Sequence, residues 1–310
     1  MIPFTKTILQ WYEKSKRNLP WRKRPINSYG VVVSEFMLQQ TQVPRVIEKY
    51  YEFMTQFPTI IDLANASKSD VVRAWSGLGY NRRALLLHKF AQEVCEKYNG
   101  TIPQSSQELI MLSGIGPYTS GSIASFAFNK PEPAIDVNVR RIYMRYFHGK
   151  DQGTPMDQQK ERELYELVKK TIPYKKSCDF HNALMDFGSL LCERKKPLCS
   201  ECPLTGSCSF YPLYKNEGEM VLHTLEKKKE NGVLEEGKHV PNRIFRGRIV
   251  EFVRKNENRE VTVTTLGRAI KKDYSPQEKK WVLMLLQNLE NDGLLTVTKK
   301  KTRIQVQLQD

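Results

Sequence analysis

The sequence of 310 residues contains no long hydrophobic run, and no stretch approaches the roughly 20 consecutive apolar residues that a membrane-spanning helix requires. The first residues, Met1-Ile2-Pro3-Phe4-Thr5-Lys6, lack the charged and then apolar build of a signal peptide. Acidic residues are also scarce: 34 Asp+Glu stand against 49 Lys+Arg, for a formal net charge of +15. We therefore expect a soluble, cytoplasmic protein with no membrane partner, whose positive charge favours a polyanion such as nucleic acid.

Cysteine is sparse and unevenly distributed. Six cysteines are too few for a disulfide scaffold of this length, and four of them fall in one short segment. Cys192, Cys199, Cys202 and Cys208 have the spacing C-x6-C-x2-C-x5-C, which can wrap one compact metal centre. Zinc and a 4Fe–4S cluster both accept four thiolates. Four-cysteine zinc sites usually contain two C-x-x-C pairs and this segment contains one, so the spacing favours one 4Fe–4S cluster.

Alternating strand patterns are almost absent from residues 1–215. Apolar stripes at helical spacing recur instead, for example Val46, Ile47, Tyr50 and Phe53 behind Pro44. Further stripes predict short helices over 60–66, 69–76, 82–98, 105–112, 117–127, 136–147, 158–172 and 179–192. The sequence thus predicts a mostly α-helical domain over residues 1–215, which includes the cysteine loop 192–208.

The composition changes after residue 215. Residues 216–240 are rich in charge and poor in large apolar residues, which is typical of a linker. Residues 241–310 show three helical stripes and then a hairpin pattern around Lys299-Lys300-Lys301. Helices followed by a basic hairpin predict a small winged-helix-like domain with Lys299 and Lys300 available to DNA. A generic small α+β domain shares the same periodicity.

Two glycines mark a tight turn between apolar helical segments, in Leu112-Ser113-Gly114-Ile115-Gly116-Pro117-Tyr118-Thr119. Backbone N–H groups at such a turn can bind a phosphate, and the pattern is typical of a helix–hairpin–helix element. About twenty residues further on, Asp136 stands in an apolar run with Asn138 close behind. Asp136 is either a helix N-cap or a carboxylate placed to stabilise a cationic sugar.

Glu35 lies between two apolar triplets, Val31-Val32-Val33 and Phe36-Met37-Leu38, with Ser34 as a candidate helix cap. An acid in such company should have a raised pKa and can donate a proton. Taken alone, the pattern is also typical of a surface glutamate on an amphipathic helix. Leu38 can wedge between bases, and Gln39 and Gln40 can reach base edges.

Together these features resemble the helix–hairpin–helix DNA glycosylases that carry an iron–sulfur cluster, above all the MutY-type adenine DNA glycosylases. The resemblance covers residues 1 to about 212. Besides the cysteine loop, it rests on Leu19-Pro20-Trp21-Arg22, Ser34-Glu35-Phe36-Met37-Leu38-Gln39-Gln40-Thr41-Gln42-Val43, Trp75-Ser76-Gly77-Leu78-Gly79-Tyr80, Gly114-Ile115-Gly116-Pro117-Tyr118-Thr119 and Ile135-Asp136-Val137-Asn138-Val139.

The resemblance implies two helical subdomains with a base pocket between them. It implies that Glu35 protonates adenine and that Asp136, with Tyr118 and Asn138 close by, stabilises the sugar cation. Related bifunctional enzymes carry a lysine at the position of Tyr118, so the tyrosine implies a monofunctional enzyme. The remaining implied contacts with DNA are Arg22 and Asn182 at the base pocket, Gln40 and Tyr80 beside the opposing guanine, and Gly114, Gly116 and Thr119 at the phosphate-binding turn.

The sequence therefore predicts a monofunctional DNA glycosylase of base excision repair, which removes adenine paired with 8-oxoguanine or guanine in double-stranded DNA. We expect a monomer associated with the nucleoid. One alternative is a pyrimidine-directed glycosylase of the same superfamily, acting on T or U opposite G or on 5-hydroxyuracil; the run Gln39-Gln40-Thr41-Gln42 favours adenine. A second alternative is a non-catalytic iron–sulfur DNA-binding regulator, which would need neither Glu35 nor Asp136.

Overall fold

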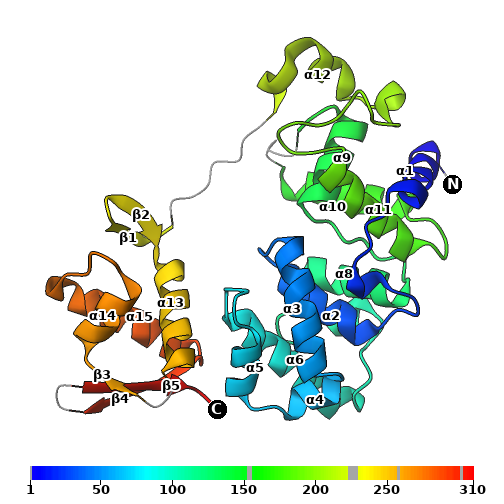
Figure 1. Ribbon diagram of the computed structural model, residues 1–310. Coiled ribbons are helices and arrows are strands. Elements are labelled where there is room, and N and C mark those ends of the chain that lie inside the picture. The colour runs from blue at the N-terminus through cyan, green and yellow to red at the C-terminus, as the bar shows by residue number, and fades with distance from the viewer. Residues whose placement is uncertain (1, 152–155, 223–229, 257–258, 301–302) are drawn as a thin grey trace. The chain divides into compact units, whose positions relative to one another are not determined.

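The computed structural model describes residues 2–151, 156–222, 230–256, 259–300 and 303–310 (Figure 1). The chain divides into two compact units, one made of Met1–Glu35 and Ile102–Lys227 and the other of Phe36–Thr101 and Lys228–Asp310. Within the described ranges, no helix combines the length and the apolar character needed to cross a membrane.

Helices build the first unit. They are α1 (Pro3–Ser15), most of α2 (Ser28–Leu38), α7 (Ser106–Leu109), α8 (Pro117–Phe128), α9 (Val137–His148), α10 (Gln158–Thr171), α11 (Ser177–Leu190) and α12 (Tyr211–Glu217). Short 3-10 turns add Pro20–Arg22, Thr205–Ser207 and Gly218–Val221.

Helix α11 forms the centre of the first unit, because it packs against α1, α8 and α9. Its residues Phe180, Ala183 and Leu184 are fully buried. Phe4 and Ile8 of α1 meet them in the same core, since residues four apart share one face of a helix. Residues of α9 belong to this core, and α8 packs directly against α11, so α11 positions both helices at which the phosphate-binding turn and Asp136 were predicted.

The second unit begins with four helices and ends with the C-terminal module. The helices are α3 (Val43–Gln56), α4 (Ile60–Asn65), α5 (Lys68–Ala74) and α6 (Arg82–Tyr98). The C-terminal module contains β1 (Gly232–Glu235), β2 (Lys238–Pro241), α13 (Asn242–Lys255), β3 (Glu260–Val261), α14 (Val263–Ile270), α15 (Lys279–Asn291), β4 (Leu295–Lys300) and β5 (Arg303–Leu308).

The C-terminal module has the element order of a winged helix. Its antiparallel sheet runs β3-β5-β4, with Val261 opposite Ile304 and Val297 opposite Val306. The helices α13, α14 and α15 lie on one side of this sheet (Figure 1). Buried residues from all three helices and from the sheet form one hydrophobic core. The predicted fold class, mostly α with a small C-terminal winged-helix-like part, is confirmed.

The structure differs from the sequence predictions at three places. The stretch 105–112 contains only the single-turn helix α7, followed by turns. Ser34 is not a cap, because α2 begins six residues earlier and Ser34 Oγ donates to the Val31 carbonyl within the helix. The predicted linker 216–240 includes the strand β1 and most of β2, joined by a turn in which Glu236 and Gly237 both have positive φ; residues 223–229 lie outside the described ranges.

An ion pair that was not predicted from the sequence connects the hairpin β1–β2 to α13. Glu235 is 7% exposed, and its carboxylate accepts hydrogen bonds from both terminal nitrogens of Arg248 on α13, at 2.7 and 2.9 Å. Glu236 and Gly237 both have the left-handed backbone conformation that the commonest two-residue hairpin turn requires. A charged, glycine-containing stretch therefore folds here as part of the module.

Candidate active site

Glu35 lies in α2 among apolar neighbours and is only 7% exposed. Ser122 of α8 reaches it: Ser122 Oγ lies 2.7 Å from Glu35 Oε2 and 3.0 Å from the carbonyl oxygen of Thr119. A serine hydroxyl carries one proton and can also accept one. When Ser122 donates its proton to Thr119, it can accept a proton from Glu35, so this geometry accommodates the neutral acid.

Burial raises the pKa of Glu35 from its ordinary value of 4.5 to about 7. Hydrogen bonds to Ser122 and Tyr118 lower the pKa, and the charge of Asp136 raises it further. The pKa of Tyr118 is raised well above 10, because burial and the charges of Glu35 and Asp136 disfavour the phenolate. Near neutral pH, Glu35 is thus a mixture of acid and carboxylate beside a tyrosine that keeps its proton.

Asp136 is the N-cap of α9, as one of the two sequence interpretations proposed. Its Oδ1 accepts hydrogen bonds from the backbone N–H groups of Asn138 and Val139, both at 2.8 Å. Its Oδ2 accepts a hydrogen bond from Nδ2 of Asn138 at 2.7 Å. Burial raises the pKa of Asp136, while these three hydrogen bonds lower it. The cap and the electrostatic role are compatible, because the charge of Asp136 raises the pKa of Glu35.

Arg141 and Gly188 hold Asn138 beside Asp136, an arrangement that was not predicted from the sequence. Arg141 donates to Asn138 Oδ1 at 2.7 Å and to the carbonyl of Gly188 at 2.7 Å. A Cβ on Gly188 would lie 2.6 Å from the Cβ of Asn138, so only glycine leaves room for this approach. The amide of Asn138 is therefore held between Asp136 and Arg141.

The predicted phosphate-binding turn leads directly into α8. Gly114 has φ +77°, Gly116 is the extended N-cap residue, and Pro117 opens the helix. Thr119 is buried in the first turn and Tyr118 is half-buried. The turn, Tyr118 and Ser122 thus all belong to the N-terminal part of one helix, whose exposed N–H groups and dipole favour an anion.

Arg22 is held by an ion pair that sequence reasoning missed. Its two terminal nitrogens lie 2.8 and 3.0 Å from the carboxylate oxygens of Asp186, and Arg17 adds Nε at 2.7 Å. Asp186 is completely buried on α11. The positive charge of Arg22 still lowers the pKa of Glu35, so both belong to the same electrostatic environment.

Asn182 and its neighbour His181 are both buried on α11. Asn182 Nδ2 lies 3.5 Å from Sγ of Cys178. His181 Nε2 accepts the backbone N–H of Ala134 at 3.2 Å, and burial lowers the pKa of His181 to about 4. The imidazole is therefore neutral at physiological pH and anchors the segment that leads to Asp136.

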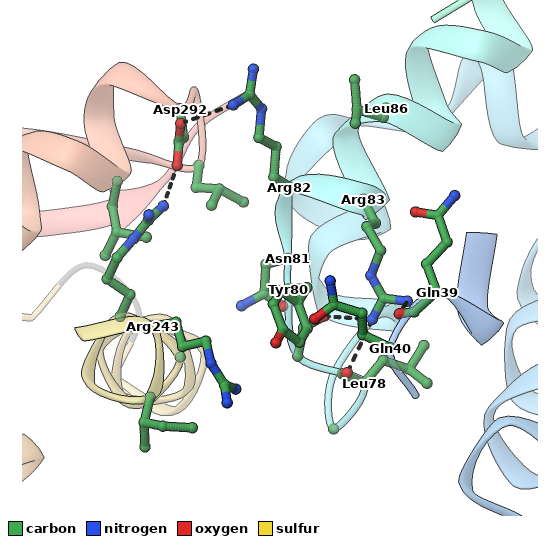
Figure 2. Close-up of a pocket in the computed structure, with 17 residues that line it drawn as sticks. Gln39, Gln40, Leu78, Tyr80, Asn81, Arg82, Arg83, Leu86, Arg243 and Asp292 are labelled. Atoms are coloured by element: carbon green, nitrogen blue, oxygen red, sulfur yellow. Dashed lines mark hydrogen bonds and ion pairs between the residues drawn. The ribbon is translucent and has the colours of Figure 1, made fainter. Parts of the chain in front are cut away.

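Leu38 is the last residue of α2, and Gln39 and Gln40 follow it in a turn. All three belong, with Tyr80, to the second unit. Gln40 and Tyr80 have positive φ, +59° and +46°. Figure 2 shows Arg83 between the two segments: it donates to the carbonyls of Met37 and Gln39 at 2.9 and 2.5 Å and to that of Gly79 at 3.0 Å. Arg83 therefore fixes both segments, a role that only the fold reveals.

The four predicted metal ligands line one cavity, together with Arg145, Thr205 and Phe210. Arg145 is 2% exposed, and its Nη1 lies 3.5 Å from Cys192 Sγ and 2.7 Å from the carbonyl of Glu193. Burial raises the pKa of Cys199 and Cys202 to about 11. All six cysteines are free thiols. Among the described residues, no three metal-binding side chains converge as ligands of a single ion.

Lys299 and Lys300 lie on β4 and are exposed. Lys300 pairs with Glu260 on β3. Both residues therefore belong to the strand rather than to the turn of the hairpin. Lys301 lies outside the described residues.

Sequence comparison places these features beside known repair proteins. The family model for HhH-GPD superfamily base excision DNA repair proteins matches residues 33–170. The adenine DNA glycosylase of Mycobacterium tuberculosis is 38% identical over 199 residues, which cover 64% of this chain and 64% of that protein. The adenine DNA glycosylase of Homo sapiens is 38% identical over 214 residues, which cover 66% of this chain and 39% of that protein. The chain thus spans less than two thirds of the length of these relatives.

Solved structures give the same result for the fold. A thermostable thymine-DNA glycosylase matches with a TM-score of 0.62 and 29% identity, over 68% of this chain and 95% of that one. An endonuclease III trapped as a covalent intermediate with DNA matches with a TM-score of 0.58 and 21% identity, over 68% and 95% of the two chains, and shows the fold alone. The resemblance inferred from the motifs is confirmed.

The raised pKa of Glu35 predicts a stability difference that depends on pH. Below pH 4.5 the folded and unfolded states both hold the proton, and burial of the neutral acid costs little. Between pH 4.5 and about 7 the unfolded state is ionised while the folded state keeps its proton, so the free energy of unfolding falls, by about 3 kcal/mol in all once the pH exceeds about 7. We expect the Glu35→Gln variant, which cannot ionise, to exceed the wild type in stability at pH 8 by up to that amount.

Urea unfolding followed by circular dichroism at pH 5, 6, 7 and 8 measures this difference. Glu13→Gln, at an exposed position of α1, is the matched control and should leave the pH profile unchanged. Parallel profiles for Glu35→Gln and the wild type would contradict a buried, proton-binding Glu35.

Arg83 supports a second prediction about stability. Arg83→Met removes all of its donors and leaves buried carbonyls unpaired, so we expect a loss of about 3 kcal/mol in the free energy of unfolding. Arg83→Lys should recover only part, since an ammonium lacks the planar fork. The neighbouring Arg82→Met is the control: the Arg82 side chain is 68% exposed, so a loss below about 0.5 kcal/mol is expected. Equal losses at positions 82 and 83 would refute the role given to Arg83.

Proposed function

We propose that this chain, whose central segment matches base excision repair proteins, is a monofunctional DNA glycosylase that hydrolyses the N-glycosidic bond of adenine paired with 8-oxoguanine or guanine. The observation that carries the proposal is the buried Glu35, with a pKa near neutrality, electrostatically coupled to Asp136. A non-catalytic regulator has no use for this pair of acids. The similarity to adenine DNA glycosylases supports the choice of base.

Glu35 serves as the general acid. An extruded adenine leaves poorly as an anion, and protonation turns it into a neutral leaving group. The pKa of about 7 means that much of Glu35 holds a proton at the pH of the cell. Ser122 orients the carboxyl group through the 2.7 Å contact. In the family resemblance, Arg22 and Asn182 line the base pocket, and we assign them that role here.

Asp136 serves as the counter-charge. As the glycosidic bond breaks, positive charge develops on the sugar, and a fixed carboxylate stabilises it. The three hydrogen bonds to Asp136 hold its oxygens in place and favour the charged form. Asn138 is thus a positioning residue. Tyr118 stands where bifunctional relatives carry lysine and cannot form a Schiff base, so water completes hydrolysis and leaves an abasic site.

The partner is double-stranded DNA, bound by a monomer in the nucleoid of the cytoplasm. Gly114, Gly116 and Thr119 place the N-terminus of α8 against a phosphate. Leu38, Gln39, Gln40 and Tyr80 enter the space that the extruded base vacates, and Lys299 and Lys300 add charge at the wing. The net charge of +15 supports a polyanionic partner.

We propose that the cysteine loop binds one 4Fe–4S cluster. Cys192, Cys199, Cys202 and Cys208 line one cavity, and the buried guanidinium of Arg145 beside Cys192 offsets the negative charge of bound thiolates. Such a cluster would be held by the four thiolates and would tie the loop together. The hydrogen bonds of Arg145 to the carbonyls of Glu193 and Arg194 hold the start of the loop.

A second candidate function has an observation of its own. The thymine-DNA glycosylase structure is 29% identical to this chain, against 21% for the endonuclease III structure. Tyr118 is compatible with both activities. A pyrimidine-directed glycosylase would remove T or U opposite G, or 5-hydroxyuracil, with the same acid and counter-charge.

A panel of duplexes tests the proposed substrate. We expect base release from A opposite 8-oxoguanine and from A opposite G, and none from T opposite G or 5-hydroxyuracil opposite G. Glu35→Gln should lower single-turnover release roughly 10²–10⁴-fold while duplex binding persists, because only the proton donor is lost. The wild-type rate should fall as pH rises above about 7, as Glu35 loses its proton.

The same panel separates the alternatives. Release from the pyrimidine duplexes alone would establish the second candidate function, and release from none would favour a regulator. Glu13→Gln, exposed on α1, serves as the control and should match the wild type in rate and pH profile.

Metal analysis tests the cluster. The full chain purified without oxygen should contain roughly four iron atoms and four sulfides, with visible thiolate-to-iron absorption. Cys199→Ser should lose iron, whereas Cys95→Ser, on α6 and outside the loop, should retain it. One zinc per chain without iron would contradict the cluster.

A further inference from the structure

Asp186 lies on α11 with no exposed surface, and two arginines share its carboxylate. Arg22 places its two terminal nitrogens 2.8 and 3.0 Å from the two carboxylate oxygens, so the planar groups meet fork to fork. Arg17 donates its Nε at 2.7 Å and its backbone N–H at 3.0 Å to the same carboxylate. These bonds occupy the roughly four acceptor sites of a carboxylate. The guanidinium of Arg22 is therefore fixed in distance and in plane against α11.

Stability alone does not account for this cluster. Desolvation of a buried carboxylate and its guanidinium partners is unfavourable, and apolar side chains of the same volume often stabilise a core equally well. Phe180 and Leu184, fully buried on the same helix, are of this apolar kind. Within the described ranges, no acid other than Asp186 pairs with Arg17 or Arg22, so two guanidinium groups face one carboxylate. The cluster thus keeps a net positive charge.

Arg22 also has donors that the protein leaves unused. A guanidinium carries five N–H groups, and only its terminal nitrogens are paired with Asp186. The Nε of Arg22 is buried and, in the part of the chain that the structure describes, has no hydrogen-bond partner. The side chain is 12% exposed, which leaves part of it within reach of a molecule that enters from solvent. Arg22 therefore retains a donor that a ligand can pair.

The charge of Arg22 reaches the proposed general acid, because it lowers the pKa of Glu35. The other groups that shift this pKa are Ser122, Tyr118 and Asp136. Coulomb energy falls with distance, so the effect of Arg22 depends on where its guanidinium lies. Arg22 ends the short 3-10 turn Pro20–Arg22, which supports it less than a long helix would. The ion pair with Asp186 therefore sets the distance between Arg22 and Glu35.

We propose that Asp186 is a positioning residue of the excision reaction, which holds the guanidinium of Arg22 at a fixed distance from Glu35 and leaves its free N–H groups to the extruded base. Asp186 acts through Arg22, since its own hydrogen bonds in the described structure go to the two arginines. This inference rests on the proposed function, which supplies the base that enters the pocket.

A double-mutant cycle on the full chain tests the path from Asp186 through Arg22. Single-turnover release of adenine opposite 8-oxoguanine is measured for Asp186→Asn, Arg22→Met and the double variant. We expect each single change to lower the rate roughly 10- to 100-fold, because the guanidinium is misplaced or lost. The double variant should be no slower than Arg22→Met, because Asp186 has no other route to the reaction. Additive losses would overturn the proposal.

The pH profile of the same rates separates positioning from a direct effect of charge. When Arg22 is lost or leaves its set position, the pKa of Glu35 rises, so the fall in rate above about pH 7 should move to higher pH in both single variants. If Asp186 acted on Glu35 by its own charge, Asp186→Asn would make the surroundings more positive and move the fall to lower pH. That result, or an unchanged profile for Asp186→Asn, would contradict a positioning role.

Asp179→Asn is the matched control, because it makes the same change on the same helix at a half-exposed carboxylate that pairs with Arg24. We expect it to alter the rate less than about twofold and to leave the pH profile unchanged. Circular dichroism melting verifies that each variant is folded. If Asp186→Asn does not fold, the variant with Arg17→Met added takes its place, because it removes one of the two uncompensated guanidinium groups, and the same shift to higher pH is expected.

A second measurement needs no excision. The pH dependence of urea unfolding is compared between each variant and the same variant carrying Glu35→Gln, so that the difference reports the pKa of Glu35 alone. The difference should level off at higher pH for Asp186→Asn than for the wild type. An unchanged or lower pH would overturn the proposal. A wild type that releases no base from any duplex would instead refute the proposed function, while this shift remains measurable.

Discussion

The burial of one carboxyl group is the constraint around which the first unit is organised. Glu35 can have a pKa near 7 only while water is excluded from the last turns of α2, and α8 is the helix that brings Ser122 to it. The same helix begins at the Gly114–Gly116 turn. A shift of α8 would therefore move the Gly114–Gly116 turn and change the proton affinity of Glu35 together.

Two carboxylates in this unit have different environments, and this difference separates their chemistry. Glu35 is buried with few hydrogen-bond donors, so its acid form is favoured. Asp136 is half-buried, and three hydrogen bonds at a helix N-terminus favour its charged form. Asn138 is central to this arrangement, because Arg141 and Gly188 hold it against the cap. Enzymes that need an acid and a counter-charge at one pH obtain them by such contrasts in environment.

The sequence alone was sufficient for what is local. Helical stripes predicted most helices, and the motifs around Glu35 and Asp136 marked two segments whose charges interact in the structure. Contacts between distant segments were not predictable. Asp186 looks like one more helical aspartate, yet it is fully buried and holds Arg17 and Arg22. The hairpin β1–β2 was missed for a related reason, because Glu235 is buried only when α13 supplies Arg248.

The docking of the C-terminal module changes how its charge should be understood. Charges on a flexible tether raise the local concentration of DNA but impose no geometry. Here Val72 and Arg254 fix α13, and Tyr80 lies between guanidinium groups from both parts of the unit. The guanidinium of Arg243 is thus held 5.3 Å from the centre of the Tyr80 ring. The charges on α13 therefore have fixed positions relative to α5 and α6, which charges on a tether would lack.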